Sequence, residues 1–311
     1  QRQMCIRDRI YMSVFSSHIP TRRFCFADIL VIGFVFAILY SLLHLGVGMT
    51  VPFSTEVQME ISTDPSDLPY YAGRSLLRMF LAYGASLIFT LIYGSIAAKT
   101  RIVQKVLIPL LDILQSVPVL GFLSITITMF MGLFPGSLLG VELASIFAIF
   151  TGQCWNMTFS FYHSLITIPK ELHEAAAVLR LNWWQRFIHL EVPFSMIGLV
   201  WNSMMSFGGG WFFLAASEAI TVLNESIRLP GVGSFMATAV EEGNMKALVY
   251  AILTMVIMIV LIDQLFWRPL VVWSQKFKME RTEALEAPTS FVYDLCKQSI
   301  FLVWLQKYAL I

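Results

Sequence analysis

Residues 167–193 read TIPKELHEAAAVLRLNWWQRFIHLEVP, a charged stretch with a long apolar segment on either side. Pro169 suits the first turn of a helix, where its missing N–H is no loss, and Thr167 is a candidate N-cap before it. The alanines at 175–177 favour helix and have almost no side-chain bulk. The stretch is too polar for lipid, so it predicts a short helix outside the membrane that another protein can approach closely.

The second half of the stretch has a different character. Trp183 and Trp184, followed by Phe187, predict an amphipathic arm at the membrane surface, because aromatic rings with a polar edge favour the water–lipid boundary. Pro193 lacks a backbone N–H, so we expect the arm to end there, just before the next apolar run.

This stretch resembles the EAA loop of ABC-importer permeases, the inner-membrane components of binding-protein-dependent transporters. The family pattern is Glu-Ala-Ala, three residues, Gly, nine residues, Ile, one residue, Leu-Pro. The wider resemblance runs from about Leu68 to Glu280 and is closest to the nitrate/sulfonate/taurine type, particularly permeases with two fused units. The residues that match the pattern or replace it conservatively are Glu174, Ala175, Ala176, Leu190, Val192 and Pro193.

Arg180 stands where the pattern has glycine. Glycine would permit a left-handed turn, whereas we expect Arg180 to turn with ordinary dihedral angles. The resemblance implies that Glu174 supplies charge at the groove of an ATPase and that Ala175 and Ala176 allow close contact. The alternative interpretation is an ordinary cytoplasmic helix-turn-helix between two spans.

Composition places the chain in a bilayer. It has 311 residues, of which 57% are hydrophobic and only 13% are charged, with a mean hydropathy of +0.72. Soluble domains carry about 25% charged residues. Apolar runs of about 20 residues are long enough to cross a membrane as helix. The sequence therefore predicts an all-α integral membrane protein, and the resemblance implies the type I permease fold with a cytoplasmic coupling helix. The six predicted spans are 27–49, 75–98, 106–131, 138–165, 194–222 and 246–268, the third interrupted at Pro109 and Pro118.

Lysine and arginine are distributed unequally between the predicted loops. With the N-terminus inside, the inner flanks hold most of them, including those of the 167–193 loop, whereas the outer segments hold four near span edges: Arg74, Arg78, Arg228 and Lys246. The positive-inside rule then places the 167–193 loop in the cytoplasm. The outer loops, 50–73 and 229–244, are candidate docking surfaces for an extracytoplasmic binding protein, or simply solvated connectors.

The ends of the chain do not fit a single permease unit. Residues 1–9, QRQMCIRDR, resemble an extraneous leader, and residues 10–26 are expected to be a cytoplasmic N-terminus. Residues 27–268 form the predicted permease domain. In the fused permeases that this chain resembles, residues 269–311 would be a linker and the start of a second, truncated permease unit.

Polar and small residues within the spans are candidates for a transport pathway. We expect Gln153 and Asn156 either to face the pathway or to bond a neighbouring helix, and the glycine triplet to serve either packing or a hinge. Glu142 is expected to face water, and Asp263 to pair with Arg268. The candidate pathway residues are Gln153, Asn156, Asn202, Ser206, Gly208, Gly209, Gly210 and Ser217.

The sequence points to transport rather than catalysis. It contains no GxxxxGK[ST] phosphate loop, no recognisable catalytic triad and no metal-ligand spacing, so we expect no catalytic residue, metal or cofactor. The resemblance implies an ATPase dimer, a binding protein and a second permease unit as partners, no nucleic acid, and a small oxyanion such as nitrate, a sulfonate or taurine as solute. An ion-coupled secondary transporter or channel is the alternative, but it would need charge pairs at the midplane and inverted repeats. A non-transporting scaffold would leave the glycine triplet unexplained.

Overall fold

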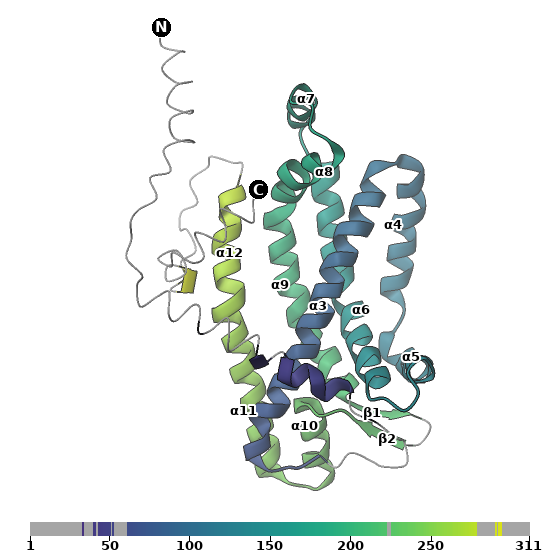
Figure 1. Cartoon of the computed structure of the whole chain (residues 1–311), viewed down its shortest axis with the longest axis vertical. Helices are drawn as coiled ribbons and strands as arrows, with labels where there is room; N and C mark the ends of the chain where they lie inside the picture. Colours follow the sequence, from purple (N-terminus) through teal and green to yellow (C-terminus); the bar gives the residue numbers. More distant parts are fainter. Residues whose placement is uncertain are drawn as a thin grey trace. The chain divides into compact units, whose positions relative to one another are not determined.

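The computed structural model describes residues 61–222 and 225–278, with residues 33, 40–41, 43–50, 52, 290 and 292–293. The predicted leader, the N-terminal segment 10–26 and most of the first span lie outside the described residues, as does most of 279–311. Residues 38–293 belong to one structural unit. Its long helices run between two ends (Figure 1): α3 (Leu68–Lys99), α4 (Arg101–Ser116), α6 (Leu139–Ile166), α9 (Val192–Glu218) and α11 (Met245–Ile262).

The short elements gather at the two ends of these helices (Figure 1). One end carries α7 (Lys170–Val178) and α8 (Trp183–Arg186). The opposite end carries α10 (Val232–Glu241) and an antiparallel hairpin of β1 (Ala219–Val222) and β2 (Glu225–Arg228). Apart from this short hairpin, the described elements are helical, as the all-α prediction requires, but the helix predicted over 194–222 is too long: α9 ends at Glu218 and the backbone becomes extended.

The third predicted span, 106–131, is two helices rather than one. The chain breaks at Val117 and Pro118, which have extended backbone between α4 and α5 (Val119–Leu133). α5 is seen end-on in Figure 1, across the direction of α4. The break predicted at Pro118 is confirmed. Its cause is that the residue before a proline, here Val117, avoids helical dihedral angles. Pro109 lies inside α4 without ending it.

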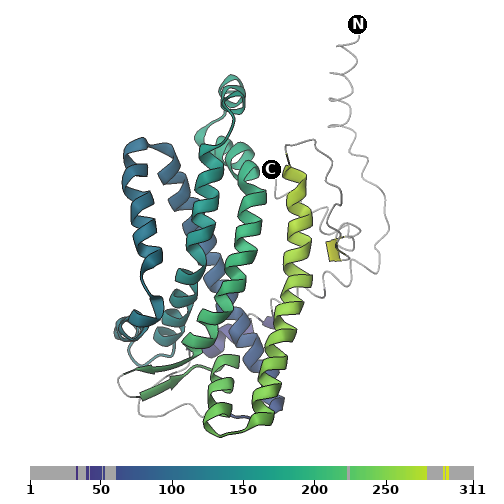
Figure 2. The ribbon, with the colours of Figure 1, turned by 180° about the vertical axis from the view of Figure 1, so that it is seen from behind.

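The last helix is longer than predicted. α11 continues through a π-helical turn, η4 (Asp263–Trp267), into α12 (Arg268–Ser274) and the 3₁₀ turn η5 (Gln275–Phe277). Figure 2 shows this helix from behind, and α9 lies against α12. Within the described residues, the helical stretches Pro65–Lys99 and Met245–Phe277 are long and apolar enough to cross a membrane.

Two π-helical turns have the same local cause. η3 (Phe187–Glu191) ends two residues before Pro193, and η4 ends two residues before Pro269. Proline lacks an N–H, and its ring collides with the carbonyl of residue i−4 in an ordinary α-helix. A wider turn just before each proline lets the helix continue. The prediction that Pro193 ends the amphipathic arm was therefore wrong: α8, η3 and α9 follow one another without a break.

An aromatic cluster joins the last helix to the others. Phe207 of α9 lies 5.3 Å from Phe80 and 5.4 Å from Trp267, measured between ring centroids. Tyr83 meets the same Trp267 ring at 5.6 Å in an edge-on arrangement. Such offset and edge-on pairs add to the free energy gained by burial. This core fixes α3, α9 and η4 relative to one another.

Candidate functional site

The loop between α6 and α9, which we call the coupling loop (residues 167–193), begins with a cap different from the predicted one. The Thr167 hydroxyl donates to the carbonyls of His163 and Ser164, so it closes the end of α6 rather than the start of α7. Pro169 stands immediately before the first residue of α7, Lys170. Only two residues, Ile168 and Pro169, thus separate the Thr167 cap from α7.

The end of α7 is a Schellman motif. The Leu181 N–H donates to the Ala176 carbonyl at 3.1 Å, and the Arg180 N–H donates to the Ala177 carbonyl at 3.0 Å. This pattern requires left-handed dihedral angles at the first residue beyond the helix cap. That residue is Arg180, and its φ is +51°. The expectation of ordinary dihedrals at Arg180 was wrong. The position where the family pattern has glycine demands the conformation that glycine adopts without strain.

The coupling loop has one face turned to solvent and one packed on the chain. Glu174 and Ala175 are exposed, and beside them Val178 and Leu179 are 83% and 69% exposed. Ala176, in contrast, is buried with Leu190 in a cluster that includes Phe161 and Leu165 of α6. Ala176 therefore seats α7 on its own chain rather than forming part of the exposed face.

Polar contacts hold the two arms of the loop together. Arg186 of α8 donates from Nη2 to His173 Nδ1 of α7 at 2.9 Å, and its Nε lies 3.3 Å from Glu191 Oε1. Asn182 and Gln185 form a capping box that starts α8. Lys99 places its Nζ 4.4 Å from the centre of the Trp183 ring, a cation–π contact between α3 and the loop.

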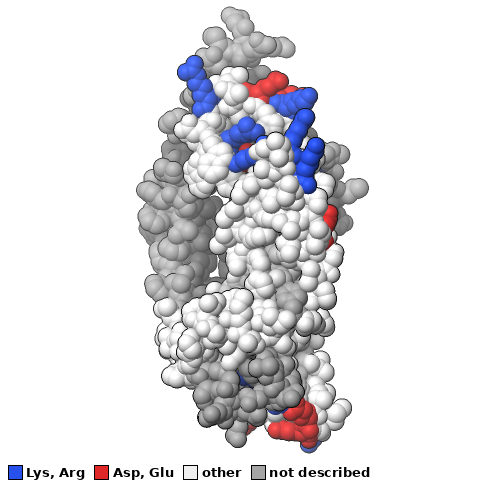
Figure 3. Space-filling view, turned by 90° about the vertical axis from the view of Figure 1, so that its right-hand side faces the viewer, with Lys and Arg blue, Asp and Glu red and all other residues white. Residues whose placement is uncertain are grey.

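Basic side chains gather at the end of the molecule that carries α7 (Figure 3). The exposed lysines and arginines there are Lys99, Arg101, Lys105, Lys170 and Arg180. At the opposite end the exposed charges include Asp64, Glu241 and Glu242. The cytoplasmic placement of the coupling loop, which was predicted from these same charges, stays a prediction.

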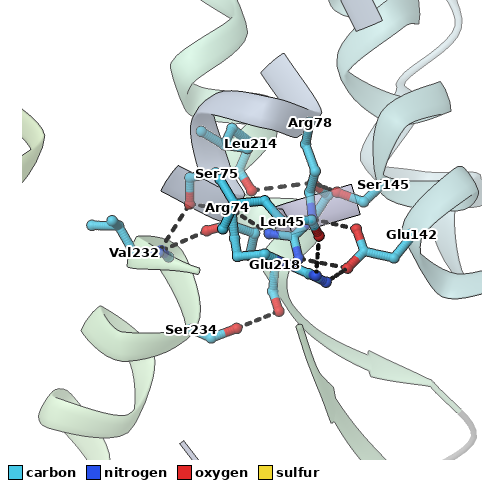
Figure 4. Close-up of polar contacts among 12 residues, drawn as sticks. Leu45, Arg74, Ser75, Arg78, Glu142, Ser145, Leu214, Glu218, Val232 and Ser234 are labelled. Carbon is cyan, nitrogen blue, oxygen red and sulfur yellow. Dashed lines mark hydrogen bonds and ion pairs between the residues drawn. The ribbon is translucent and has the colours of Figure 1, made fainter. Parts of the chain in front are cut away.

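A cluster of four buried charges lies at the end opposite the coupling loop (Figure 4). Arg74 and Arg78 are one turn apart on α3 and share a face, and both contact Glu142 of α6. Arg78 forks onto Glu142 at 2.5 and 2.8 Å, and its other Nη lies 2.7 Å from Glu218 of α9. All four side chains are 0% exposed. The expectation that Glu142 faces water was wrong.

The same cluster holds the start of α10. Glu218 accepts hydrogen bonds from the Ser75 hydroxyl and from the Gly233 N–H, at 2.5 and 2.7 Å. A Cβ at Gly233 would lie 2.6 Å from the Ala215 carbonyl oxygen, and one at Gly231 would collide with the Glu218 carboxylate. The two glycines are therefore required by the close approach of α10 to a buried carboxylate.

The polar candidate pathway residues fall in two places. Asn156 and Asn202 line a groove of about 430 Å³ with Ser160 and His163, and Asn202 donates to the Ser160 hydroxyl at 3.0 Å. Gln153, Ser206 and Ser217 are buried between helices instead. Ser217 bonds Ser145 at 2.7 Å, whereas Gln153 Nε2 reaches only the Met79 sulfur, at 3.6 Å.

The three glycines of α9 differ in their surroundings. A Cβ at Gly210 would lie 2.6 Å from Gln153 Nε2 and 2.9 Å from Met79 Cε, so this glycine serves close packing. Gly208 and Gly209 are exposed, with nothing within 4 Å of such a Cβ. α9 runs unbroken through all three positions.

Residues 90–266 match the family described as "Binding-protein-dependent transport system inner membrane component". The chain belongs to this family. The match covers the coupling loop and Pro193, the proline that follows η3, and ends three residues before Pro269.

Three curated relatives of this permease carry the name "Nitrate import permease protein NrtB". They come from Leptolyngbya laminosa (24% identical over 179 residues, 58% of this chain and 59% of the relative), Synechocystis sp. (21% over 190 residues, 61% and 64%) and Synechococcus elongatus (21% over 169 residues, 54% and 56%). In each case the matched region spans less than two thirds of the relative. The family is one of membrane transport components, and the relatives are named for nitrate import.

Removing one charge from the buried cluster should strongly destabilise the permease. Glu142→Leu leaves Arg74 and Arg78 with a single carboxylate, and breaking a buried pair from one side costs about 3–5 kcal/mol. The matched control is Asp263→Asn, which breaks an exposed pair with Arg268 whose atoms are 3.6 Å apart; such pairs contribute about 0–1 kcal/mol. Thermal unfolding in detergent measures both, and equal shifts would contradict the role of the cluster.

Replacing Arg180 with the glycine of the family pattern should stabilise the coupling loop. Left-handed dihedrals cost a non-glycine residue about 1–2 kcal/mol. Arg180→Gly removes both the charge and this strain. The control, Arg180→Ala, removes the charge but retains the strain. Limited proteolysis of the loop should be slower in Arg180→Gly than in Arg180→Ala. Equal protection of the two variants would mean that the strain is absent in solution.

Proposed function

We propose that this chain is the transmembrane permease subunit of an ATP-driven ABC importer that passes a small oxyanion from an extracytoplasmic binding protein into the cytoplasm by alternating access. The observation that supports this most directly is the exposed face of α7. Glu174 and Ala175 stand beside the bare apolar side chains of Val178 and Leu179 at the basic end of the molecule. An apolar face with a small residue at its centre suits insertion into a groove of a partner.

The structure of the coupling loop suits it for transmitting motion. Only Ile168 and Pro169 separate the Thr167 cap of α6 from α7, while α8 passes through η3 directly into α9. The Arg186 contacts and the buried Ala176 hold α7 against both helices. A displacement of α7 by an ATPase would therefore move α6 and α9 as one body, the rigid-body type of transition.

The groove between α6 and α9 is the best candidate for a solute-lining surface. Apart from Phe159, the described lining residues carry amides, hydroxyls and an imidazole, and none of them carries a carboxylate that would repel an anion. Asn156 and Asn202 lie in it, as the pathway hypothesis requires. The names of the curated relatives specify nitrate import, which favours an oxyanion as the solute here.

The exposed face of α9 suggests where a second permease unit would lie. Trp201, Met205 and Phe212 are 45%, 70% and 63% exposed, at helical spacing with Gly208 and Gly209 between them. We place the second unit, fused or separate, against this face and the groove beside it, so that the pathway runs between the two. The binding protein would dock at the opposite end, on the surface of the hairpin and α10.

One observation favours the alternative of an ion-coupled transporter or channel, and another counts against it. Buried charge pairs exist, which the sequence did not lead us to expect. They lie at the α10 end rather than midway along the helices, and two arginines balance two glutamates. A charge-neutral cluster tying helices together fits a structural joint better than an ion site.

Overfilling the exposed face of α7 should uncouple the ATPase. Ala175→Trp adds bulk where two proteins would interlock, and overpacking costs about 1–3 kcal/mol, about tenfold or more in affinity. Glu174→Lys should also weaken the contact by reversing a charge. In vesicles containing the ATPase and binding protein, both variants should lose ATP-dependent uptake of labelled nitrate and solute-stimulated ATP hydrolysis.

The control for this experiment is Ala177→Trp, the same substitution about 200° around α7 from Ala175, which should keep most of the stimulation. Ala176→Trp is not a suitable test, because Ala176 is buried and the larger ring would unseat the loop itself. Wild-type stimulation by Ala175→Trp and Glu174→Lys would mean that this loop is not the coupling element. Uptake without ATP would instead favour the secondary transporter.

Cysteine labelling tests the orientation. In a cysteine-free background, Ser62→Cys at the α10 end should react with a membrane-impermeant reagent in intact cells, because Ser62 is exposed there. Glu171→Cys in the coupling loop should react only after the membrane is ruptured. The opposite pattern would overturn the proposed topology.

A further inference from the structure

A second hollow, also of about 430 Å³, lies where the coupling loop meets the ends of α3 and α6. We call it the loop-base hollow. Its charged and polar lining residues come from four elements: Lys99 from the end of α3, His173 from α7, Arg186 from α8 and Glu191 from η3. Apolar walls are supplied by residues that include Leu165, Ile168 and Trp183.

Two buried atoms in this hollow have no hydrogen-bond partner among the described residues: Arg186 Nε and Glu191 Oε2. The Glu191 side chain is only 8% exposed, and its other oxygen is the one beside Arg186. One is a donor and the other an acceptor, and buried polar groups without partners are uncommon in native proteins. The hollow thus presents an acceptor without a donor, Glu191 Oε2, beside an Arg186 Nε that forms an ion pair with Glu191 Oε1 at 3.3 Å but no hydrogen bond in the described part of the chain.

The charges of the hollow do not balance. Lys99 and Arg186 supply two positive charges and Glu191 one negative charge, an excess of one. Arg186 can only donate, so the His173 Nδ1 that it contacts is an acceptor, and the neutral ring carries its proton on Nε2. Lys99 meets the face of Trp183, and no carboxylate is recorded beside it in the described part of the chain. A ligand for this site therefore carries an anionic group that the two cations can contact.

We propose that the loop-base hollow binds a phosphate group that carries its own hydrogen-bond donor. Phosphate oxygens would accept from Arg186 Nε and from Lys99, and the donor of the ligand would bond Glu191 Oε2. Hydrogen phosphate, with its P–OH group, has this chemistry, as does the phosphoethanolamine headgroup of a lipid, with its ammonium. A bound phosphate would tie the end of α3 to α8 and η3 and so stiffen the base of the coupling loop.

The test is a binding measurement on the purified full chain in detergent, with no ATPase or binding protein present. The probes are sodium phosphate, with sodium sulfate as control at equal ionic strength, and short-chain phosphatidylethanolamine, with phosphatidylcholine as control. Sulfate and the quaternary headgroup resemble the two ligands but have no N–H or O–H for Glu191. We expect calorimetry to show phosphate or phosphatidylethanolamine binding at least about tenfold tighter than its control, the value of one charge-assisted hydrogen bond.

Variants locate the site. Lys99→Gln should weaken binding about tenfold, whereas Lys105→Gln, an exposed lysine at the same end that does not line the hollow, should leave it unchanged. Glu191→Gln supplies an amide donor in place of the free acceptor, so the preference for phosphate over sulfate, or for the amine headgroup over choline, should disappear.

Binding of phosphate alone would identify a soluble anion as the ligand, and binding of the amine lipid alone would identify a headgroup; either supports the proposal. Binding of neither probe would overturn it, as would equal affinity for a probe and its control in the wild type, or unchanged affinity in Lys99→Gln. The assay needs no transport, so such a result would leave the proposed import function standing.

Discussion

Arg78 lies between two carboxylates from two other helices, and the arrangement of the α10 end depends on this contact. Its guanidinium forks onto Glu142 of α6 and reaches Glu218 of α9, and Glu218 in turn holds the first turn of α10. Burying four charges is expensive, and only close pairing with further hydrogen bonds compensates for it. Such a cluster tolerates little change of geometry, so it fixes where α3, α6, α9 and α10 meet.

The coupling loop is held by different physics. Its contacts with the bundle include the apolar packing of Ala176 and Leu190 on α6 and a cation–π contact from Lys99, while the Arg186 guanidinium, shared between His173 and Glu191, ties its two arms together. These contacts are individually weak and partly exposed. A loop built in this way can be moved as a unit by a partner without breaking a buried charge pair.

The sequence predicted one long helix to within a residue at each end, since 138–165 became Leu139–Ile166, and the predicted break at Pro118 is present. It also predicted the Asp263–Arg268 pair, whose partners are five residues apart and within reach along one helix. Both successes rest on local information. Hydropathy and helix propensity depend on residues within a few turns of one another, so they predict features of this local kind.

The failures all involve partners that are distant along the chain, or backbone that compensates for one residue. Glu142 meets Arg78 across 64 positions, and Glu218 meets it across 140, so no local pattern relates them. The spacing of Arg74 and Arg78, one turn apart near the start of an apolar helix, was the available signal that both charges share a buried face. Arg180 was misjudged for another reason: residue preference suggested ordinary dihedrals, but the hydrogen bonds that close α7 require φ above zero.

The contrast between the two ends bears on how such a chain could work. Alternating access by rigid bodies requires helices that keep their relative positions while a force is applied at one end. At the α10 end the buried charges provide this rigidity, and the aromatic core of Phe207, Tyr83 and Trp267 extends it along α3, α9 and η4. At the loop end, helix continues from α8 through η3 into α9 despite Pro193, because the π-helical turn absorbs what proline removes. If Pro193 had ended the helix, as proline usually does, flexible backbone would join the loop to α9. A displacement of the loop would then not be transmitted to α9. The wide turn thus preserves a continuous helix from α8, the second arm of the coupling loop, to the buried carboxylate of Glu218 at the far end of α9.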